Sequence, residues 1–236
     1  MSNMKRLCWF LTACLVLSLI GLTLSSWKMF EFRSKYRSLI EKEVWEHRLS
    51  ENKIYDNGRI VFFGDSLVRN WPMAMSFGVL PIANKGIRGE MALDALNRFD
   101  KDVIALNPKV LIILTGTNDL ADGQSVTEII NNIEAMFIKA ESKGIKIIVC
   151  SLLPVRDSHV QTHPTDSILQ INQGLEKLSQ QYQADYVDLY SELVNTEGLL
   201  KEKFTADGLH PNEPGYFRIS RVLLPSLLKY ADNFMN

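Results

Sequence analysis

Five short apolar runs punctuate the chain from residue 59 onward. They cover residues 59–63, 79–83, 110–114, 145–151 and 185–189. The runs are rich in Val and Ile and are apolar without strict alternation. This pattern predicts strands that are buried on both faces, as in a parallel sheet.

The stretches between these runs have the periodicity of helices. Ser125 and Glu128 have the spacing of a capping box, the helical pattern then continues to Glu141, and Gly144 ends it. Further helices are predicted at residues 90–106, 167–183 and 216–234. Strands that alternate with helices in this way predict an open α/β sheet covered by helices on both faces.

The N-terminal stretch has a different pattern. Residues 7–24 carry no charge, and at about 1.5 Å per residue a helix of this length spans about 27 Å, close to the hydrocarbon thickness of a bilayer. An uncleaved signal anchor is the favoured interpretation. A cleaved signal peptide, a buried soluble helix and lipidation at Cys14, in the lipobox-like sequence Leu11-Thr12-Ala13-Cys14, remain alternatives.

The domain organisation follows from these patterns. We predict a signal anchor or transmembrane helix at residues 1–27, a juxtamembrane helix and linker at 28–55, and a globular α/β domain at 56–236. Basic residues flank the apolar stretch on both sides, so counting charges leaves the orientation ambiguous. Because signal-like segments usually deliver the following domain outward, we expect a membrane-anchored protein with an extracytoplasmic domain, periplasmic or on the cell surface.

Composition excludes several classes of protein. The formal net charge of −1 gives no electrostatic basis for a nucleic-acid partner. The three cysteines form no CxxC pair that would suggest a metal site. Cys150, at the end of a predicted strand, is interpreted as a small buried hydrophobic residue, and a cysteine nucleophile is the alternative. The GxxxxGK[ST] loop of P-loop phosphoryl transfer is missing.

Candidate chemistry lies where the predicted strands end, because ligands of open α/β sheets bind beyond the carboxyl ends of the strands. Ser66 follows the first predicted strand and precedes an expected helix, but a serine hydroxyl needs a base to become a nucleophile. His210 lies three residues after Asp207, which can orient the imidazole and support its positive charge. The other histidines are His47, His159 and His163.

Acyl transfer also needs hydrogen-bond donors that face the oxyanion. The backbone N–H of Gly89, the side-chain amide of Asn118 and the N–H of Ser66 are candidates at three strand ends. Taken singly, each residue has an ordinary interpretation as a turn or cap residue. Together, these signals at one edge of the sheet favour a serine hydrolase.

Four segments resemble the conserved blocks of SGNH (GDSL-type) hydrolases in order and spacing. They are Gly64-Asp65-Ser66-Leu67, Asn84-Lys85-Gly86-Ile87-Arg88-Gly89, Gly116-Thr117-Asn118-Asp119 and Asp207-Gly208-Leu209-His210-Pro211-Asn212. The resemblance covers residues 59–231 and is greatest to the platelet-activating-factor-acetylhydrolase-like branch.

This resemblance implies a flavodoxin-like three-layer fold with a five-stranded parallel sheet in the order 2-1-3-4-5. It implies an acyl-enzyme on Ser66, a triad with Asp207 and His210, and an oxyanion hole formed by Ser66, Gly89 and Asn118. No metal and no organic cofactor are expected. Asp65 and Asp119 would hold loops by hydrogen bonds.

The substrate is less constrained, because a fold hosts many functions. Short-acyl ester hydrolysis, on a small-molecule or glycan ester, ranks first, and a lysophospholipase or thioesterase acting on lipid substrates ranks second. A non-catalytic glycan- or lipid-binding module would have lost the serine or the histidine, and neither is lost. Lys85 and Arg88 flank the oxyanion loop and face either an anionic substrate group or solvent.

Overall fold

The computed structural model describes residues 59–78 and 80–230, all within the second of the two units into which the chain divides, Asn52–Asn236. The predicted anchor at residues 1–27 and the predicted juxtamembrane segment at 28–55 lie outside the described residues, and the domain boundaries stay a prediction. Over the described part of the chain, no helix has the length and apolar character needed to cross a membrane.

The described residues form a parallel sheet of five strands in the order β2-β1-β3-β4-β5. The strands are β1 (Ile60–Gly64), β2 (Ile82–Gly86), β3 (Val110–Leu114), β4 (Lys146–Cys150) and β5 (Asp185–Val187). Gly64 at the end of β1 pairs with Gly86 of β2 and Leu114 of β3, so these three strands end at the same level. The predicted parallel α/β sheet and its strand order are confirmed.

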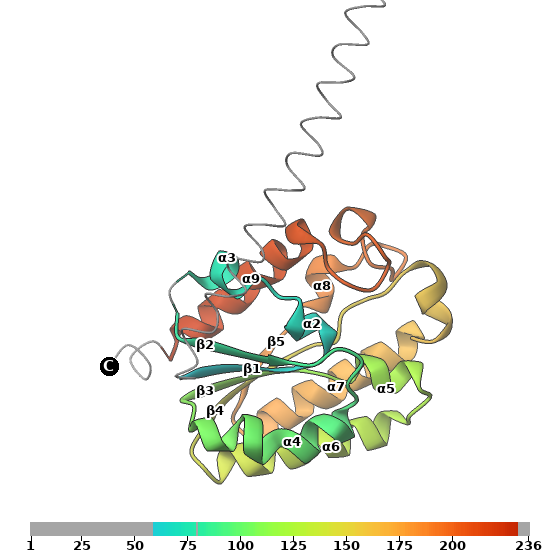
Figure 1. Ribbon diagram of the computed structural model, residues 1–236. Helices are drawn as coiled ribbons and strands as arrows, with labels where there is room; N and C mark the ends of the chain where they lie inside the picture. The colour runs from blue at the N-terminus through green and yellow to red at the C-terminus, as the bar shows by residue number, and fades with distance from the viewer. Residues whose placement is uncertain (1–58, 79, 231–236) are drawn as a thin grey trace, which may run out of the picture. The chain divides into compact units, whose positions relative to one another are not determined.

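Helices cover both faces of the sheet. Figure 1 shows α4, α6 and α7 along one face, and α3, α8 and α9 on the other. The α-helices are α2 (Ser66–Arg69), α3 (Met73–Phe77), α4 (Ala92–Asp102), α5 (Thr117–Ala121), α6 (Val126–Glu141), α7 (Thr165–Gln181), α8 (Tyr190–Leu193) and α9 (Glu213–Leu228). Short 3-10 helices occupy Ile104–Leu106, Asp157–Gln161 and Glu202–Phe204.

The local signals for α6 are confirmed in detail. The Ser125 hydroxyl accepts the Glu128 N–H, and the Glu128 carboxylate accepts the Ser125 N–H, which together form the predicted capping box. At the other end, Gly144 has a φ of +68° and ends the turn that follows the helix.

The prediction for the second strand was wrong in position, since β2 begins at Ile82 and not at residue 79. Pro81 has no N–H to give to a strand, so the ladder starts after it. The polar residues Asn84 and Lys85 belong to the strand because β2 lies at the edge of the sheet. The Asn84 side chain also has a partner there, because it donates to the Val68 carbonyl at 2.8 Å.

Three helix boundaries also differ from the predictions. The helix predicted at 90–106 begins at Ala92 and ends at Asp102, the one predicted at 167–183 spans Thr165–Gln181, and α9 begins at Glu213, before the predicted 216. Asn212 explains the last shift, because its side chain accepts the Gly215 N–H at 3.1 Å and caps the helix with Pro214 in the first turn.

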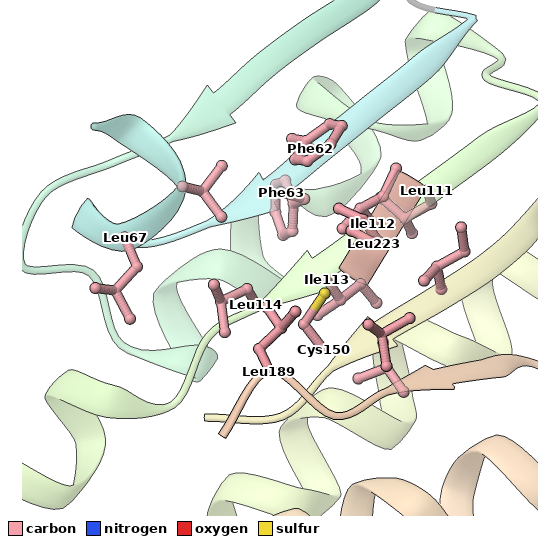
Figure 2. Close-up of a cluster of buried hydrophobic side chains, with 14 of the residues drawn as sticks. Phe62, Phe63, Leu67, Leu111, Ile112, Ile113, Leu114, Cys150, Leu189 and Leu223 are labelled. Atoms are coloured by element: carbon pink, nitrogen blue, oxygen red, sulfur yellow. The ribbon is translucent and has the colours of Figure 1, made fainter. Parts of the chain in front are cut away.

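The core lies between the sheet and its helices (Figure 2). Every residue of β1 and β3 is buried. Phe62 packs against Trp71, and Phe63 against Phe99, both in edge-on geometry. Cys150 is fully buried in the same hydrophobic core, and burial raises the pKa of its thiol to about 12. Its interpretation as a small buried hydrophobic residue is confirmed.

Candidate active site

Ser66 begins the short helix α2, directly after β1. Asp65 caps this helix, since its Oδ1 accepts the Leu67 N–H at 2.8 Å. The Tyr216 hydroxyl of α9 donates to the Leu67 carbonyl at 2.9 Å, which fastens α2 from the other side. Two bonds therefore hold the backbone on which the half-buried Ser66 is placed.

The structure brings Ser66, His210 and Asp207 together in one hydrogen-bonded chain. The Ser66 Oγ lies 2.9 Å from His210 Nε2, and His210 Nδ1 lies 2.7 Å from Asp207 Oδ2. Ser66 and His210 are 144 residues apart in the sequence. This is the order of contacts that an activated serine requires, while the catalytic roles themselves remain a prediction.

The Asp207 carboxylate is held in its ionised form. Its Oδ1 accepts the N–H groups of Leu209 at 3.0 Å and His210 at 2.8 Å. Burial alone would raise the pKa of Asp207, but these bonds and the bond from the His210 ring outweigh it and lower the pKa to about 2. A negative charge therefore faces His210 Nδ1 throughout the neutral pH range.

The loop that carries Asp207 and His210 is closed on itself. Thr205 Oγ1 donates to the His210 carbonyl at 2.8 Å and accepts the Gly208 N–H at 2.9 Å. The backbone N–H of Arg156, from the segment after β4, donates to the Gly208 carbonyl at 2.9 Å. These bonds fix the direction in which the imidazole projects.

The other two described histidines lie elsewhere. His163 is buried, with Nδ1 bonded to Thr162 Oγ1 at 2.9 Å and to the His159 carbonyl at 3.1 Å. Its burial lowers its pKa, which favours a neutral ring. The rings of His159 and His163 pack on each other with centroids 5.9 Å apart. Both side chains therefore have a local structural explanation. His47 lies outside the described residues.

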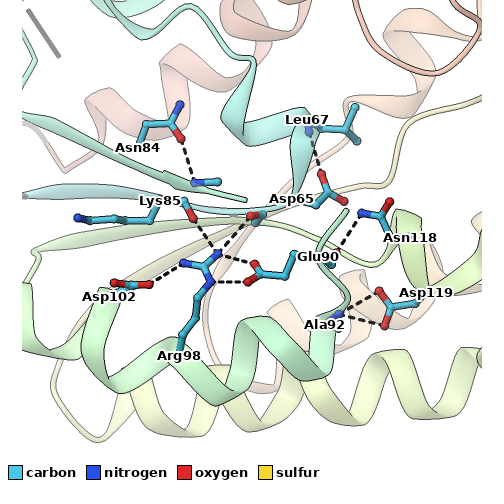
Figure 3. Close-up of polar contacts among 12 residues, drawn as sticks. Asp65, Leu67, Asn84, Lys85, Glu90, Ala92, Arg98, Asp102, Asn118 and Asp119 are labelled. Atoms are coloured by element: carbon cyan, nitrogen blue, oxygen red, sulfur yellow. Dashed lines mark hydrogen bonds and ion pairs between the residues drawn. The ribbon is translucent and has the colours of Figure 1, made fainter. Parts of the chain in front are cut away.

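The two other candidate oxyanion donors lie beyond the ends of the neighbouring strands. Residues 87–90, which we call the Gly89 loop, follow β2. Asn118, which Figure 3 labels, lies in α5 after β3. Gly89 has a φ of +73°, a conformation that favours glycine, and nothing lies within 4 Å of where a Cβ would stand. The Asn118 Nδ2 donates to the Glu90 carbonyl at 3.0 Å. Their assignment as oxyanion donors stays a prediction.

The predicted loop-holding bonds of Asp65 and Asp119 are confirmed. Asp119 accepts the Ala92 N–H with both carboxylate oxygens at 3.0 Å, which fixes the start of α4 just beyond the Gly89 loop. Burial raises the pKa of Asp119. Arg88 is exposed and donates to Asn70 Oδ1 at 3.0 Å, and Lys85 is half-buried in β2.

Sequence reasoning missed one polar cluster beside the site, formed by Arg98 and Glu90. The side chains of these two residues are 14% and 6% exposed, and they form an ion pair. The available signal was an arginine between the core positions Ala95 and Phe99 of a helix.

Asp65 should make the folded state sensitive to pH. Its Oδ2 is buried without a hydrogen-bond partner among the described residues, and burial, with smaller contributions from Asp119 and Glu90, raises its pKa to about 7. A raised carboxyl pKa means that the folded state holds the proton that the unfolded state loses. The stability that Asp65 contributes is therefore complete below pH 4 and falls by up to about 4 kcal/mol as the pH rises to 7.

This prediction is checked by urea unfolding of the wild type and Asp65→Asn between pH 4.5 and 7.5. The unfolding free energy of the wild type should fall relative to that of the variant across this range. A difference between the two proteins that stays constant with pH would contradict a raised pKa. Groups common to both proteins that do not interact with Asp65, such as Asp207, cancel in the comparison.

Comparison with known proteins places these features in a family. The model of the GDSL-like lipase/acylhydrolase family matches residues 62–218. The chain is 32% identical over 126 residues to YqeF, an uncharacterized lipoprotein of Bacillus subtilis, with 44% of this chain and 52% of the lipoprotein aligned. It is 26% identical over 155 residues to an acetylxylan esterase of Xylanibacter ruminicola, with 54% of this chain and 30% of the esterase aligned. The chain thus spans about half or less of these relatives.

The fold has solved counterparts. A Streptococcus pneumoniae protein that is provisionally assigned as a platelet activating factor superposes with a TM-score of 0.67 at 27% identity, over 82% of this chain and 99% of that one. This similarity agrees with the predicted branch. The family match covers well over half of the chain and includes Ser66, Gly89, Asn118, Asp207 and His210. The chain therefore belongs to the GDSL-like lipase/acylhydrolase family, the SGNH hydrolases.

Proposed function

We propose that the protein is a serine esterase that hydrolyses short-acyl carboxylic esters through an acyl-enzyme on Ser66. The observation that carries this proposal is the continuous chain from Ser66 Oγ through the His210 ring to the Asp207 carboxylate, with contacts of 2.9 and 2.7 Å. An alcohol, a base and a carboxylate that orients the base are the three parts that nucleophilic acyl transfer needs.

In the acylation step, Ser66 Oγ attacks the carbonyl carbon of the ester while His210 Nε2 takes the hydroxyl proton. The Asp207 carboxylate supports the positive charge that forms on the imidazole. The carbonyl oxygen becomes an oxyanion, which accepts hydrogen bonds from the N–H groups of Ser66 and Gly89 and from the Asn118 amide. The bond to the leaving alcohol then breaks, and His210 gives this alcohol the proton.

Deacylation repeats the same steps with water. His210 Nε2 accepts a proton as the water oxygen attacks the acyl carbon of the ester on Ser66. The oxyanion forms again between the same donors, and its collapse breaks the bond to Ser66 Oγ. The proton returns to Oγ, and a carboxylic acid leaves.

Two observations bear on the substrate. The acetylxylan esterase relative favours short acyl groups on a glycan ester. An apolar pocket between α3 and α9 favours the second candidate, a lysophospholipase or thioesterase that acts on a longer chain. This pocket is lined by Pro72, Met75, Ser76, Glu213, Pro214 and Phe217. We rank the short-acyl ester first because the acetylxylan esterase is named for an ester hydrolysis, whereas the pocket shows only that apolar space is present.

The test is a panel of p-nitrophenyl esters from acetate to palmitate, with the full-length protein and its Ser66→Ala variant. We expect hydrolysis that is fastest for acetate and butyrate and that Ser66→Ala abolishes. A preference for palmitate would favour the lipid substrate. Undiminished hydrolysis by Ser66→Ala would remove Ser66 as the nucleophile. No turnover of any ester would support a non-catalytic binding module.

We also propose that the domain is anchored to the membrane and acts outside the cytoplasm. The uncharged stretch at residues 7–24 supports an N-terminal anchor. The similarity to a protein named a lipoprotein supports an extracytoplasmic location, and it gives weight to the alternative of lipidation at Cys14.

A further inference from the structure

Glu90 lies between two of the proposed oxyanion donors. It directly follows Gly89, and its carbonyl accepts the Asn118 amide at 3.0 Å. Any displacement of Glu90 therefore moves the Gly89 N–H through the chain and the Asn118 side chain through its hydrogen bond. What holds Glu90 also holds both donors.

The side chain of Glu90 is held by Arg98 of α4 (Figure 3). Arg98 Nε donates to Glu90 Oε1, and Arg98 Nη2 donates to Glu90 Oε2, both at 2.5 Å. Two parallel bonds between a planar guanidinium and a carboxylate fix orientation as well as distance. The ion pair therefore constrains where Glu90 lies and how it is turned.

The same guanidinium binds the ends of two strands. Arg98 Nη2 also donates to the Lys85 carbonyl in β2 at 2.8 Å and to the Gly64 carbonyl in β1 at 3.3 Å. The guanidinium carbon Cζ of Arg98 lies 4.2 Å from the centre of the Phe63 ring. Arg98 thus joins three segments of the site: the strand before Ser66, the strand before the Gly89 loop, and the end of that loop.

The Gly89 loop itself is poorly supported by packing. Ile87 is 46% exposed, and Arg88 and Gly89 are also exposed. No atom lies within 4 Å of where a Gly89 Cβ would stand, so no side chain packs on that side of the residue. The position of the Gly89 N–H is therefore set from the two ends of the loop, and Glu90 is one of them.

A buried ion pair is a costly way to obtain stability alone, since two charges lose their hydration and an apolar pair of similar volume often does as well. The advantage of such an ion pair over an apolar contact is that it fixes the orientation of the two side chains. We propose that the Glu90–Arg98 ion pair positions the Gly89 loop so that the Gly89 N–H and the Asn118 amide converge on the oxyanion. Glu90 and Arg98 are positioning residues. The proposal rests on the proposed esterase function.

The test compares two variants, each of which replaces one of the two carboxylates that pair with Arg98 by an amide. Glu90→Gln acts on the Gly89 loop. Asp102→Asn is the matched control, because Asp102 accepts from Arg98 Nη1 at 3.1 Å and lies at the end of α4, away from the loop. With p-nitrophenyl acetate, we expect Glu90→Gln to lower kcat by about 10- to 100-fold with little change in KM, because the donors act mainly in the transition state. Asp102→Asn should retain kcat within about twofold.

A second readout does not depend on turnover. Amide hydrogen exchange in residues 86–92 should quicken in Glu90→Gln and stay unchanged in Asp102→Asn. Unchanged exchange in Glu90→Gln, faster exchange without loss of kcat, or equal effects of both variants would each overturn the proposal. If the wild type hydrolysed no ester, the proposed function would fail, while the exchange comparison would still decide whether the pair positions the loop. Should Glu90→Gln not fold, Arg98→Lys replaces it, because lysine keeps the charge and loses the two-point contact.

Discussion

The His210→Ala variant is expected to lose about four to six orders of magnitude in kcat for p-nitrophenyl acetate. The imidazole is bonded to Ser66 Oγ at 2.9 Å and to Asp207 at 2.7 Å. Without it, the serine has no base, and the leaving alcohol has no proton donor. Steady-state kinetics at neutral pH measure the loss. Residual activity would come from the oxyanion donors and from substrate binding.

His159→Ala is the control for this change, because His159 lies in the segment after β4 and packs on His163. Its kcat should stay within about twofold of the wild type. The Ser66→Ala and His210→Ala changes should also be non-additive, so that the double variant is no slower than either single one. Loss of activity in His159→Ala with retention in His210→Ala would show that the base has been misassigned.

The elements that were predicted correctly from the sequence are those with local signals. The Ser125–Glu128 capping box marks the start of α6, and Gly144 marks the end of the turn that follows it. Each of these signals lies within a few neighbouring residues of the sequence. The second strand was misplaced because its ends depend on Pro81 and on its position at the edge of the sheet, which apolar periodicity does not encode. The four- and five-residue helices α2, α3, α5 and α8 are too short to show a period.

The site divides in the same way. Ser66 and His210 stand in recognisable blocks, so their residue types could be predicted, but the 2.9 Å contact between them depends on chain folding across 144 residues. Arg98 could not be predicted as part of the site. Its partners include the backbone carbonyls of Gly64 and Lys85, and a carbonyl carries no signature in the sequence. Polar groups that bind backbone atoms of distant strands are therefore the ones most easily missed.

Gly64→Ala is expected to lower the unfolding free energy by about 4 kcal/mol, the largest stability loss of the single changes considered. A Cβ at this position would stand 1.8 Å from the Leu114 carbonyl oxygen of β3. Since Gly64 and Leu114 are paired in the sheet, the two strands would have to separate to admit the methyl group. Urea unfolding monitored by circular dichroism measures the loss.

Gly123→Ala separates steric conflict from the conformational preference of glycine. Gly123 has a φ of +81°, but nothing lies within 4 Å of where its Cβ would stand. The change should lower the unfolding free energy by only about 1 kcal/mol, from backbone strain alone.

Gly64→Ala should also lower kcat, because the Gly64 carbonyl accepts hydrogen bonds from Ile87 and Arg98, and its displacement would shift the Gly89 loop. Equal stability losses in the two variants would mean that β1 and β3 are not packed as closely as the structure has them.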